Sequence, residues 1–183
     1  MHVNRLSGTS SDFTTAELWV CDPSHCFNWT ETGWHNGHRC CGISGSGLSW
    51  FFAEDWEGTQ GPGCDGSGYI EHYYPDRPVN LGETHVAKIL YYENFRWQAY
   101  IDGVAIGTTR PCHFDWTQDM RTGTELTYDS AQITADASGL QKRTTSGSSY
   151  DWPGSFPELD GVSAPSFDIY WLNPYKSAAW YGN

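Results

Sequence analysis

Short runs of β-branched and aromatic residues recur along this chain, and turn residues such as glycine, proline, asparagine and aspartate separate them. No long segment shows the hydrophobic period of an amphipathic helix. The chain is therefore predicted to be all-β. The predicted strands are residues 15–20, 27–34, 48–56, 68–74, 85–92, 95–101, 104–109, 123–129, 132–135 and 166–172.

Turn chemistry indicates how neighbouring strands connect. Asp102-Gly103 lies between two strand-like runs and is the strongest hairpin signal in the chain, because both residues tolerate a positive φ. Glu93-Asn94 is predicted to close the preceding hairpin. Many short antiparallel strands favour an antiparallel two-sheet β-sandwich or jelly roll.

The length of 183 residues suits one domain with a substantial core. We find no internal repeat and no separate linker, so we predict a single β-sandwich domain over residues 1–183. Residues 57–67 are rich in glycine and are predicted to form a loop. Residues 139–165 are rich in serine, glycine and proline and are predicted to form a long irregular loop, a kind of segment that is often functional.

The charge balance argues against several classes of partner. Ten Lys and Arg against 22 Asp and Glu give a net charge of −12, which argues against nucleic acid and against anionic membrane surfaces. No apolar run is long enough to predict membrane insertion. Aromatic residues make up 16% of the chain. Many of them are needed for a core, and the remainder favour a concave surface that binds sugars or extended peptides.

The even number of cysteines predicts disulfide bonds in a secreted, extracellular protein. Cys21 and Cys26 flank a short turn and are predicted to pair with each other. Cys40 and Cys41 are adjacent, so we expect each to reach a distant cysteine, and the sequence does not decide which. The six cysteines are Cys21, Cys26, Cys40, Cys41, Cys64 and Cys112.

A metal site is the alternative for part of this set. His35, His38, Cys40 and Cys41 are possible ligands, but their spacing matches no standard zinc module, so no metal is expected. The start of the chain is polar and does not read as a signal peptide, so we expect the numbering to begin at a mature end.

Glu31 lies in a segment that otherwise reads as a buried strand. On alternating positions it shares a face with Phe27, Trp29 and Gly33. Desolvation among aromatic rings should raise the pKa of this carboxyl, which would make it useful as an acid or a hydrogen-bond donor. A half-exposed glutamate at a strand edge gives the same pattern.

Two further strands repeat this aromatic and acidic pattern. If the strands are neighbours, their faces would line one aromatic cleft that contains acids. Trp29, Trp50, Trp56 and Tyr73 would line this cleft and bind the substrate, and Glu54 and Glu71 would support it. The faces are Trp50, Phe52, Glu54 and Trp56 on one strand, and Tyr69, Glu71 and Tyr73 on the other.

Glu125 is the second candidate catalytic carboxylate. It shares a face with Gly123 and Thr127, on the small and polar side of a predicted strand where a ligand could approach. A solvated strand glutamate is the alternative explanation.

Three short motifs, in this order, resemble the neprosin-type glutamic peptidases. Thr30-Glu31-Thr32-Gly33-Trp34 is similar to the motif around the first catalytic glutamate of that family. The segment from Gly63-Cys64 through Gly68-Tyr69-Ile70 is similar to the Cys- and Gly-rich stretch that follows this motif. Gly123-Thr124-Glu125-Leu126 resembles the motif of the second glutamate, with Thr124 where the family usually has a second glycine. More distantly, the first motif resembles that of fungal eqolisins, in which a glutamine stands at the position of Glu31.

This resemblance implies a lectin-like jelly roll and a secreted endopeptidase that hydrolyses peptide bonds at acidic pH. Glu125, ionised, would take a proton from water, and Glu31, neutral, would donate a hydrogen bond to the developing oxyanion. No metal or other cofactor is needed. A glycosidase, or a carbohydrate-binding or structural surface module that recognises polysaccharide, is the alternative on the same fold.

Overall fold

The computed structural model describes residues 1–9, 11–22, 26–41, 43–44, 46–58, 66–77, 79–115, 117, 119–125, 133–138, 141–143, 149–151, 167–173 and 177–182. Its secondary structure is all β-strand in these residues, as the sequence predicts. None of the described segments forms a helix long and apolar enough to cross a membrane. The strands are β1 (His2–Leu6), β2 (Phe13–Cys21), β3 (Trp29–Gly37), β4 (Ser49–Glu57), β5 (Ser67–Tyr74), β6 (Ala87–Glu93), β7 (Arg96–Ile101), β8 (Val104–Thr108), β9 (Asp119–Gly123), β10 (Ile133–Ser138), β11 (Gln141–Arg143), β12 (Ser149–Asp151), β13 (Phe167–Asn173) and β14 (Ser177–Gly182).

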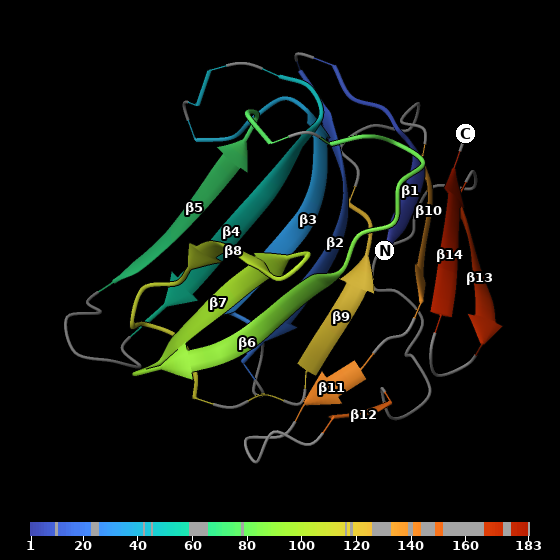
Figure 1. Ribbon diagram of the computed structural model, residues 1–183. Helices are drawn as coiled ribbons and strands as arrows, with labels where there is room; N and C mark the ends of the chain where they lie inside the picture. The colour runs from blue at the N-terminus through green and yellow to red at the C-terminus, as the bar shows by residue number, and fades with distance from the viewer. Residues whose placement is uncertain are drawn as a thin grey trace.

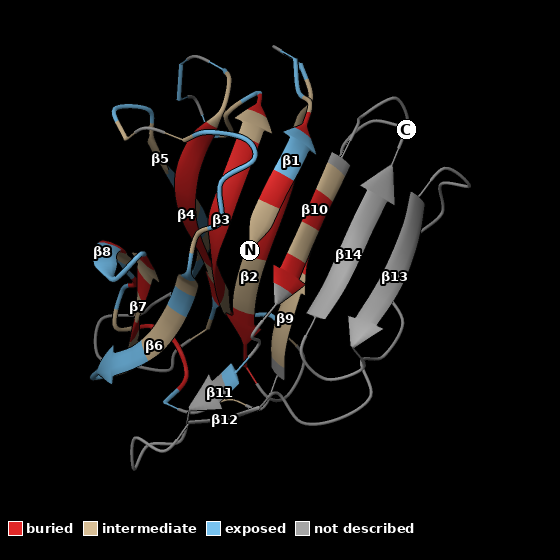
Figure 2. Cartoon of the chain, turned by 45° about the vertical axis from the view of Figure 1, so that its right-hand side comes forward, coloured by how far each residue is buried: buried red, intermediate tan, exposed pale blue. Residues whose placement is uncertain are grey.

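The largest sheet has five antiparallel strands in the order β5-β4-β3-β2-β9. It meets two smaller sheets, β6-β7-β8 and β1-β10-β14-β13. Figure 1 shows β6 to β8 lying across the five-stranded sheet, and Figure 2 shows β1 lying over β2 with β10 beside β1. The fold is therefore the predicted antiparallel β-sandwich, with the second layer divided between two sheets.

The core lies between these layers. Trp34, Trp50 and Phe52 come from the five-stranded sheet and are almost fully buried, and the rings of Trp34 and Trp50 lie 4.4 Å apart. Each buried side chain of this size stabilises the fold by roughly 1.5–3 kcal/mol. The second layer contributes smaller apolar residues to the same cluster, namely Val3, Leu6, Ala99, Ile101, Ile106, Ala135 and Ala137.

The strand predictions differ from the structure in a few places. The polar start of the chain is strand β1, in which Val3 alternates into the core, and the final strand β14 was not predicted. The segment 139–165 is not wholly irregular, because β11 and β12 pair within it. Strand β9 spans Asp119–Gly123, so Glu125 follows its end, and residues 126–129 lie outside the described part.

Both predicted hairpins are present. Asp102 and Gly103 have positive φ values of 50° and 79°, as the predicted turn requires. The preceding turn is shifted by one residue, because Glu93 ends β6 and the positive φ values belong to Asn94 and Phe95.

The disulfide prediction is confirmed for one bond and wrong for another. Cys21 and Cys26 are bonded. Cys40 and Cys41 are bonded to each other and so cannot reach a distant cysteine. Cys41 has a left-handed backbone with φ of 59°, and Ile43 N–H donates to the Cys40 carbonyl, so a tight turn lets adjacent side chains meet. Cys112 is also disulfide-bonded, and Cys64 lies outside the described residues.

The packing of β8 against β4 can be tested at Gly107. A Cβ at this position would lie 2.3 Å from Cγ of the buried Phe52 ring. We expect Gly107→Ala to lower the free energy of unfolding by about 1–3 kcal/mol because the core must shift to accommodate the methyl group. Urea denaturation measures this change. Val104→Ala, at a 52% exposed site on the same strand, should change it by less than about 0.5 kcal/mol.

Candidate functional site

The register of the five-stranded sheet gathers glutamates on one of its faces. Glu31 is paired with Trp19 on β2 and with Ala53 on β4, and Ala53 is paired with Glu71 on β5. Residues paired across neighbouring strands point to the same side. Glu17 lies two residues from Trp19 and so shares this side, which we call the acid face. The opposite side is the core face.

Glu125 approaches the acid face from the end of β9. Its carbonyl accepts a hydrogen bond from Thr15 N–H at 2.9 Å, and its own N–H donates to Thr15 Oγ1 at 3.0 Å. These bonds extend the pairing of β9 with β2 past the last residue of the strand. Glu17, Glu31 and Glu71 are buried, whereas Glu125 is exposed. Three of the four carboxyls are therefore withdrawn from water, and the fourth, Glu125, is exposed but still partly desolvated by the protein around it.

Burial sets the ionisation of the two deepest carboxyls. The pKa of Glu31 is raised well above its usual value by burial, and then by the charges of Glu17, Glu125 and Glu71. Burial also raises the pKa of Glu17 well above its usual value, with the charge of Glu125 as the next cause. The pair therefore holds on to protons at a pH where an exposed glutamate is ionised.

The pKa values of Glu71 and Glu125 are raised less than those of Glu17 and Glu31. The pKa of each carboxyl is raised, and burial is the first cause in both. Glu71 accepts hydrogen bonds from the hydroxyls of Tyr69 and Tyr73, which occupy both of its oxygens. Tyr73 in turn accepts a bond from Cys40 N–H at 3.0 Å. Glu71 is thus held as an acceptor, and its oxygens are already engaged by the protein.

Two glycines give the carboxyls their space. Gly33 on β3 and Gly123 on β9 are the residues opposite Glu17 on its two neighbouring strands. A Cβ at Gly33 would lie 2.1 Å from the Ala16 carbonyl oxygen, so no other residue fits without moving the backbone. The Gly33 of the motif therefore has a physical role, because it leaves the area between Glu17 and Glu31 free of side chains.

A neutral histidine borders the acid face. His35 is paired with Thr15 and is almost fully buried. Its ring stacks on Phe13 at 5.5 Å and meets the edge of Tyr73 at 4.7 Å. Burial lowers the pKa of His35 to about 4, so it carries no charge near the glutamates over most of the acid range.

The structure brings together only part of the predicted site. Glu31, Glu71, Glu125, Trp29 and Tyr73 belong to the acid face. The ring of Trp29 lies 5.6 Å from that of Tyr69. Trp29 and Tyr73 therefore lie on the same side of the sheet as these carboxyls.

The prediction of one shared aromatic face is wrong for β4. Its register pairs Ala53 rather than Glu54 with Glu31, so Trp50, Glu54 and Trp56 point to the core face. Trp50 packs in the core, and Trp56 lies under the Arg110 guanidinium at 4.2 Å. These three residues therefore cannot take part in chemistry on the acid face.

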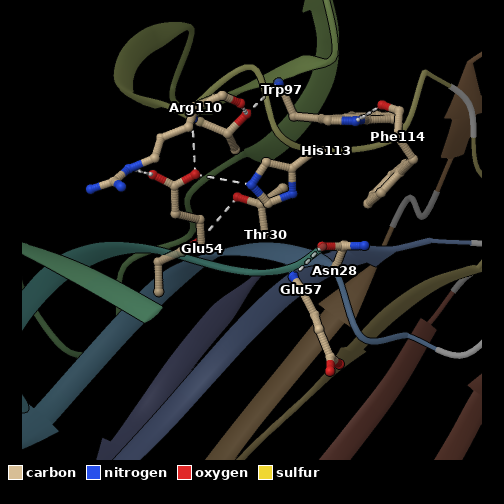
Figure 3. Close-up of polar contacts among 10 residues, drawn as sticks. Asn28, Thr30, Glu54, Glu57, Trp97, Arg110, His113 and Phe114 are labelled. Carbon is tan, nitrogen blue, oxygen red and sulfur yellow. Dashed lines mark hydrogen bonds and ion pairs between the residues drawn. The ribbon is translucent and has the colours of Figure 1, made fainter. Parts of the chain in front are cut away.

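Glu54 instead makes hydrogen bonds and ion pairs that hold the fold together. Its Oε2 accepts a bond from Arg110 N–H at 2.9 Å and lies 2.9 Å from Nε2 of the buried His113 (Figure 3). These contacts tie the segment after β8 to the sheet. Breaking a buried pair of this kind by removing one partner typically costs about 3–5 kcal/mol of stability.

Glu17 is not among the site residues predicted from the sequence. The signal was present, because Thr15, Glu17 and Trp19 alternate along a correctly predicted strand in the same way that Glu31 alternates with aromatic residues. The metal alternative also loses its basis, since Cys40 and Cys41 are bonded to each other and offer no thiolate.

Comparisons with known proteins bear on the fold. No family model matches the chain, and no curated protein matches its sequence. Among solved structures, the fold is similar to the crystal structure of aspergilloglutamic peptidase from Aspergillus niger, with a TM-score of 0.59 and 9% identity over 93% of this chain and 99% of that chain. At this identity the likeness shows a glutamic-peptidase type of fold and nothing finer.

The buried carboxyls predict an unusual dependence of stability on pH. The folded pKa values of Glu17 and Glu31 are raised, so the folded state holds protons that the unfolded state releases above about pH 4.3. Stability should therefore be greatest in acid and fall as the pH rises towards the folded pKa values. The loss is roughly 1.4 kcal/mol for each unit by which a pKa is raised.

Urea midpoints at several pH values from about 4 to about 8, an interval that begins near the usual glutamate pKa and extends above it, measure this effect. The variant with both Glu17→Gln and Glu31→Gln should lose clearly less stability across the series than the wild type. Glu93→Gln, at an exposed position on β6, should follow the wild type. Parallel curves for all three proteins would contradict the assignment of these two carboxyls.

Proposed function

We propose that this chain is a secreted glutamic peptidase of the neprosin type that hydrolyses peptide bonds at acidic pH. One observation carries the proposal: on one face of a sheet with a glutamic-peptidase type of fold, the charge of the exposed Glu125 acts on the buried Glu31. Two carboxyls with unlike surroundings are the arrangement that lets one act as an acid and the other as a base.

The two roles follow from the surroundings of each group. Glu125 is exposed and its pKa is raised less than that of Glu31, so it is the carboxyl that ionises first. As the general base, it takes a proton from a water molecule that attacks the peptide carbonyl carbon. The proton then returns from Glu125 to the amine as the carbon–nitrogen bond breaks.

Glu31 stabilises the charge that develops on the carbonyl oxygen. Its raised pKa means that it holds its proton at a pH where Glu125 is ionised, and its O–H donates a hydrogen bond to the oxyanion. A donor withdrawn from water needs little reorganisation when the charge develops. No metal ion or other cofactor takes part in these steps.

The substrate of this proposal is an extended peptide or protein. Trp29, Tyr69 and Tyr73 lie beside the carboxyls on the acid face and offer apolar surface with polar edges. The disulfide bonds are consistent with an oxidising, extracellular location. The same aromatic residues could serve a polysaccharide, so a carbohydrate-binding module is the alternative that the experiment must separate.

The test is the cleavage of an unstructured protein and of a quenched peptide library across the acid range. We expect activity that peaks below neutral pH and that survives chelators and serine-directed inhibitors. Glu125→Gln removes the base and should lower kcat/KM by about 100-fold to 10,000-fold. Glu31→Gln keeps an N–H donor, so its loss should stay below the roughly 100-fold to 1,000-fold that removal of an oxyanion donor causes.

Two controls guard against loss of folding. Glu54→Gln lies on the core face and should keep most of its activity per folded molecule, and Glu93→Gln should match the wild type. If the pure wild type cleaves nothing in the acid range but binds oligosaccharides, the peptidase proposal is wrong and the binding-module alternative replaces it.

A further inference from the structure

Glu17 occupies the centre of the acid face. Its strand, β2, lies between β3, which carries Glu31, and β9, which leads to Glu125. The residues opposite it on both strands are glycines, so neither neighbour covers its side chain. Glu17 is therefore the carboxyl that stands between the two proposed catalytic glutamates.

Glu17 also contacts Glu31 directly. Glu17 is paired with Gly33, two residues from Glu31 on β3, so the two carboxyls are diagonal neighbours on one face of the sheet. Each acts on the pKa of the other through a side-chain hydrogen bond, and Thr15 also hydrogen-bonds to Glu17. Only 2% of Glu17 and 7% of Glu31 is exposed. Two carboxylates this close in a buried setting cannot both be ionised, so the contact requires at least one shared proton.

The second oxygen of Glu17 is left without a partner. Oε2 is buried and makes no hydrogen bond to any residue in the part of the chain that the structure describes. Burying a carboxyl oxygen without a hydrogen-bond partner destabilises the folded state, and the cost is larger when the carboxyl is ionised than when it is neutral. A fold that only needed to fill this space would be better served by an apolar side chain, which indicates a role in the chemistry of the acid face.

We propose that Glu17 is a positioning residue that shares a proton with Glu31 and holds Glu31 in its neutral, hydrogen-bond-donating form. The proposal rests on the proposed peptidase function for its catalytic consequence, but the proton sharing stands on the contact between the carboxyls. Glu17 itself is buried and needs no contact with the substrate.

The other charged and titratable groups of the acid face are distinct from this pair. Glu71 is bound by two tyrosines, and its charge is a later contribution to the pKa of Glu31 than those of Glu17 and Glu125. Asp55 from β4 and Arg121 from β9 are placed on the same face by the register, and His35 borders it. Glu125 acts on both members of the pair.

The prediction is a fall in the pKa of Glu31. In Glu17→Gln the charge next to Glu31 is gone, and the amide can donate to a Glu31 carboxylate, so both effects lower the pKa of Glu31. We expect a fall of at least about one unit. The pKa of Glu17 should change much less in Glu31→Gln, because the hydrogen bond from Glu31 lowers it and the glutamine amide can still donate. Titration of glutamate carboxyl signals by NMR, with ¹³C-labelled glutamate, measures both values.

The activity profile supplies a second measurement. Hydrolysis requires protonated Glu31, so Glu17→Gln should move the alkaline limb of kcat against pH to lower pH by the same amount as the pKa. In the Glu31→Gln background no proton is shared, and adding Glu17→Gln should leave the pH profile unchanged. Glu71→Gln is the matched control, a buried glutamate of the same face whose removal should shift the pKa of Glu31 less.

These outcomes separate the two proposals. A Glu31 pKa that is unchanged in Glu17→Gln overturns the proton sharing whether or not the protein is a peptidase. A protein that shows the fall in the Glu31 pKa but cleaves nothing keeps the pair and loses the peptidase function. If Glu17→Gln fails to fold, the titration of the wild type decides, because a shared proton requires the pair to titrate in two coupled steps, and two independent steps overturn the proposal.

Discussion

The antiparallel register of β2, β3 and β4 is the constraint on which the rest of the structure depends. On β3 the acid face carries Glu31 and the core face carries Thr30, so a slip of one residue would exchange the two and place the Glu31 carboxyl in the core. Thr30 Oγ1 and Thr32 Oγ1 donate to the carbonyls of Ala53 and Phe51, both at 2.9 Å, which adds side-chain bonds to this register.

Burying several carboxyls together is unfavourable, and the fold offsets this penalty in several ways. Protonation reduces the charge of the pair formed by Glu17 and Glu31, since burial raises the pKa of both. Two phenol hydroxyls bind Glu71, and Glu125 stays in contact with water. The tryptophan-rich core on the other side of the same sheet supplies the hydrophobic stabilisation that lets such a cluster persist.

Much of the architecture could be predicted from the sequence because it depends on local signals. Period-two alternation and the Asp102-Gly103 turn identify strands and a hairpin, and the alternation around Glu31 indicates an unusual carboxyl. The face of Glu54 could not be predicted, because register is a property of two strands and neither strand encodes it alone. The Cys40–Cys41 bond depends on a left-handed turn residue that composition does not reveal.

The contrast between Glu54 and Glu31 shows how one residue type takes two roles in neighbouring strands. Glu54 is buried beside Arg110 and His113, whose donors match its oxygens, so its surroundings favour a fixed structural contact. The charges that act on Glu31 are all carboxylates, and they oppose its ionisation. A carboxyl that is neutral, buried and next to an ionisable partner is poised to donate a proton or a hydrogen bond. The charge of the neighbours, rather than burial as such, therefore distinguishes the acid face as the place where chemistry is expected.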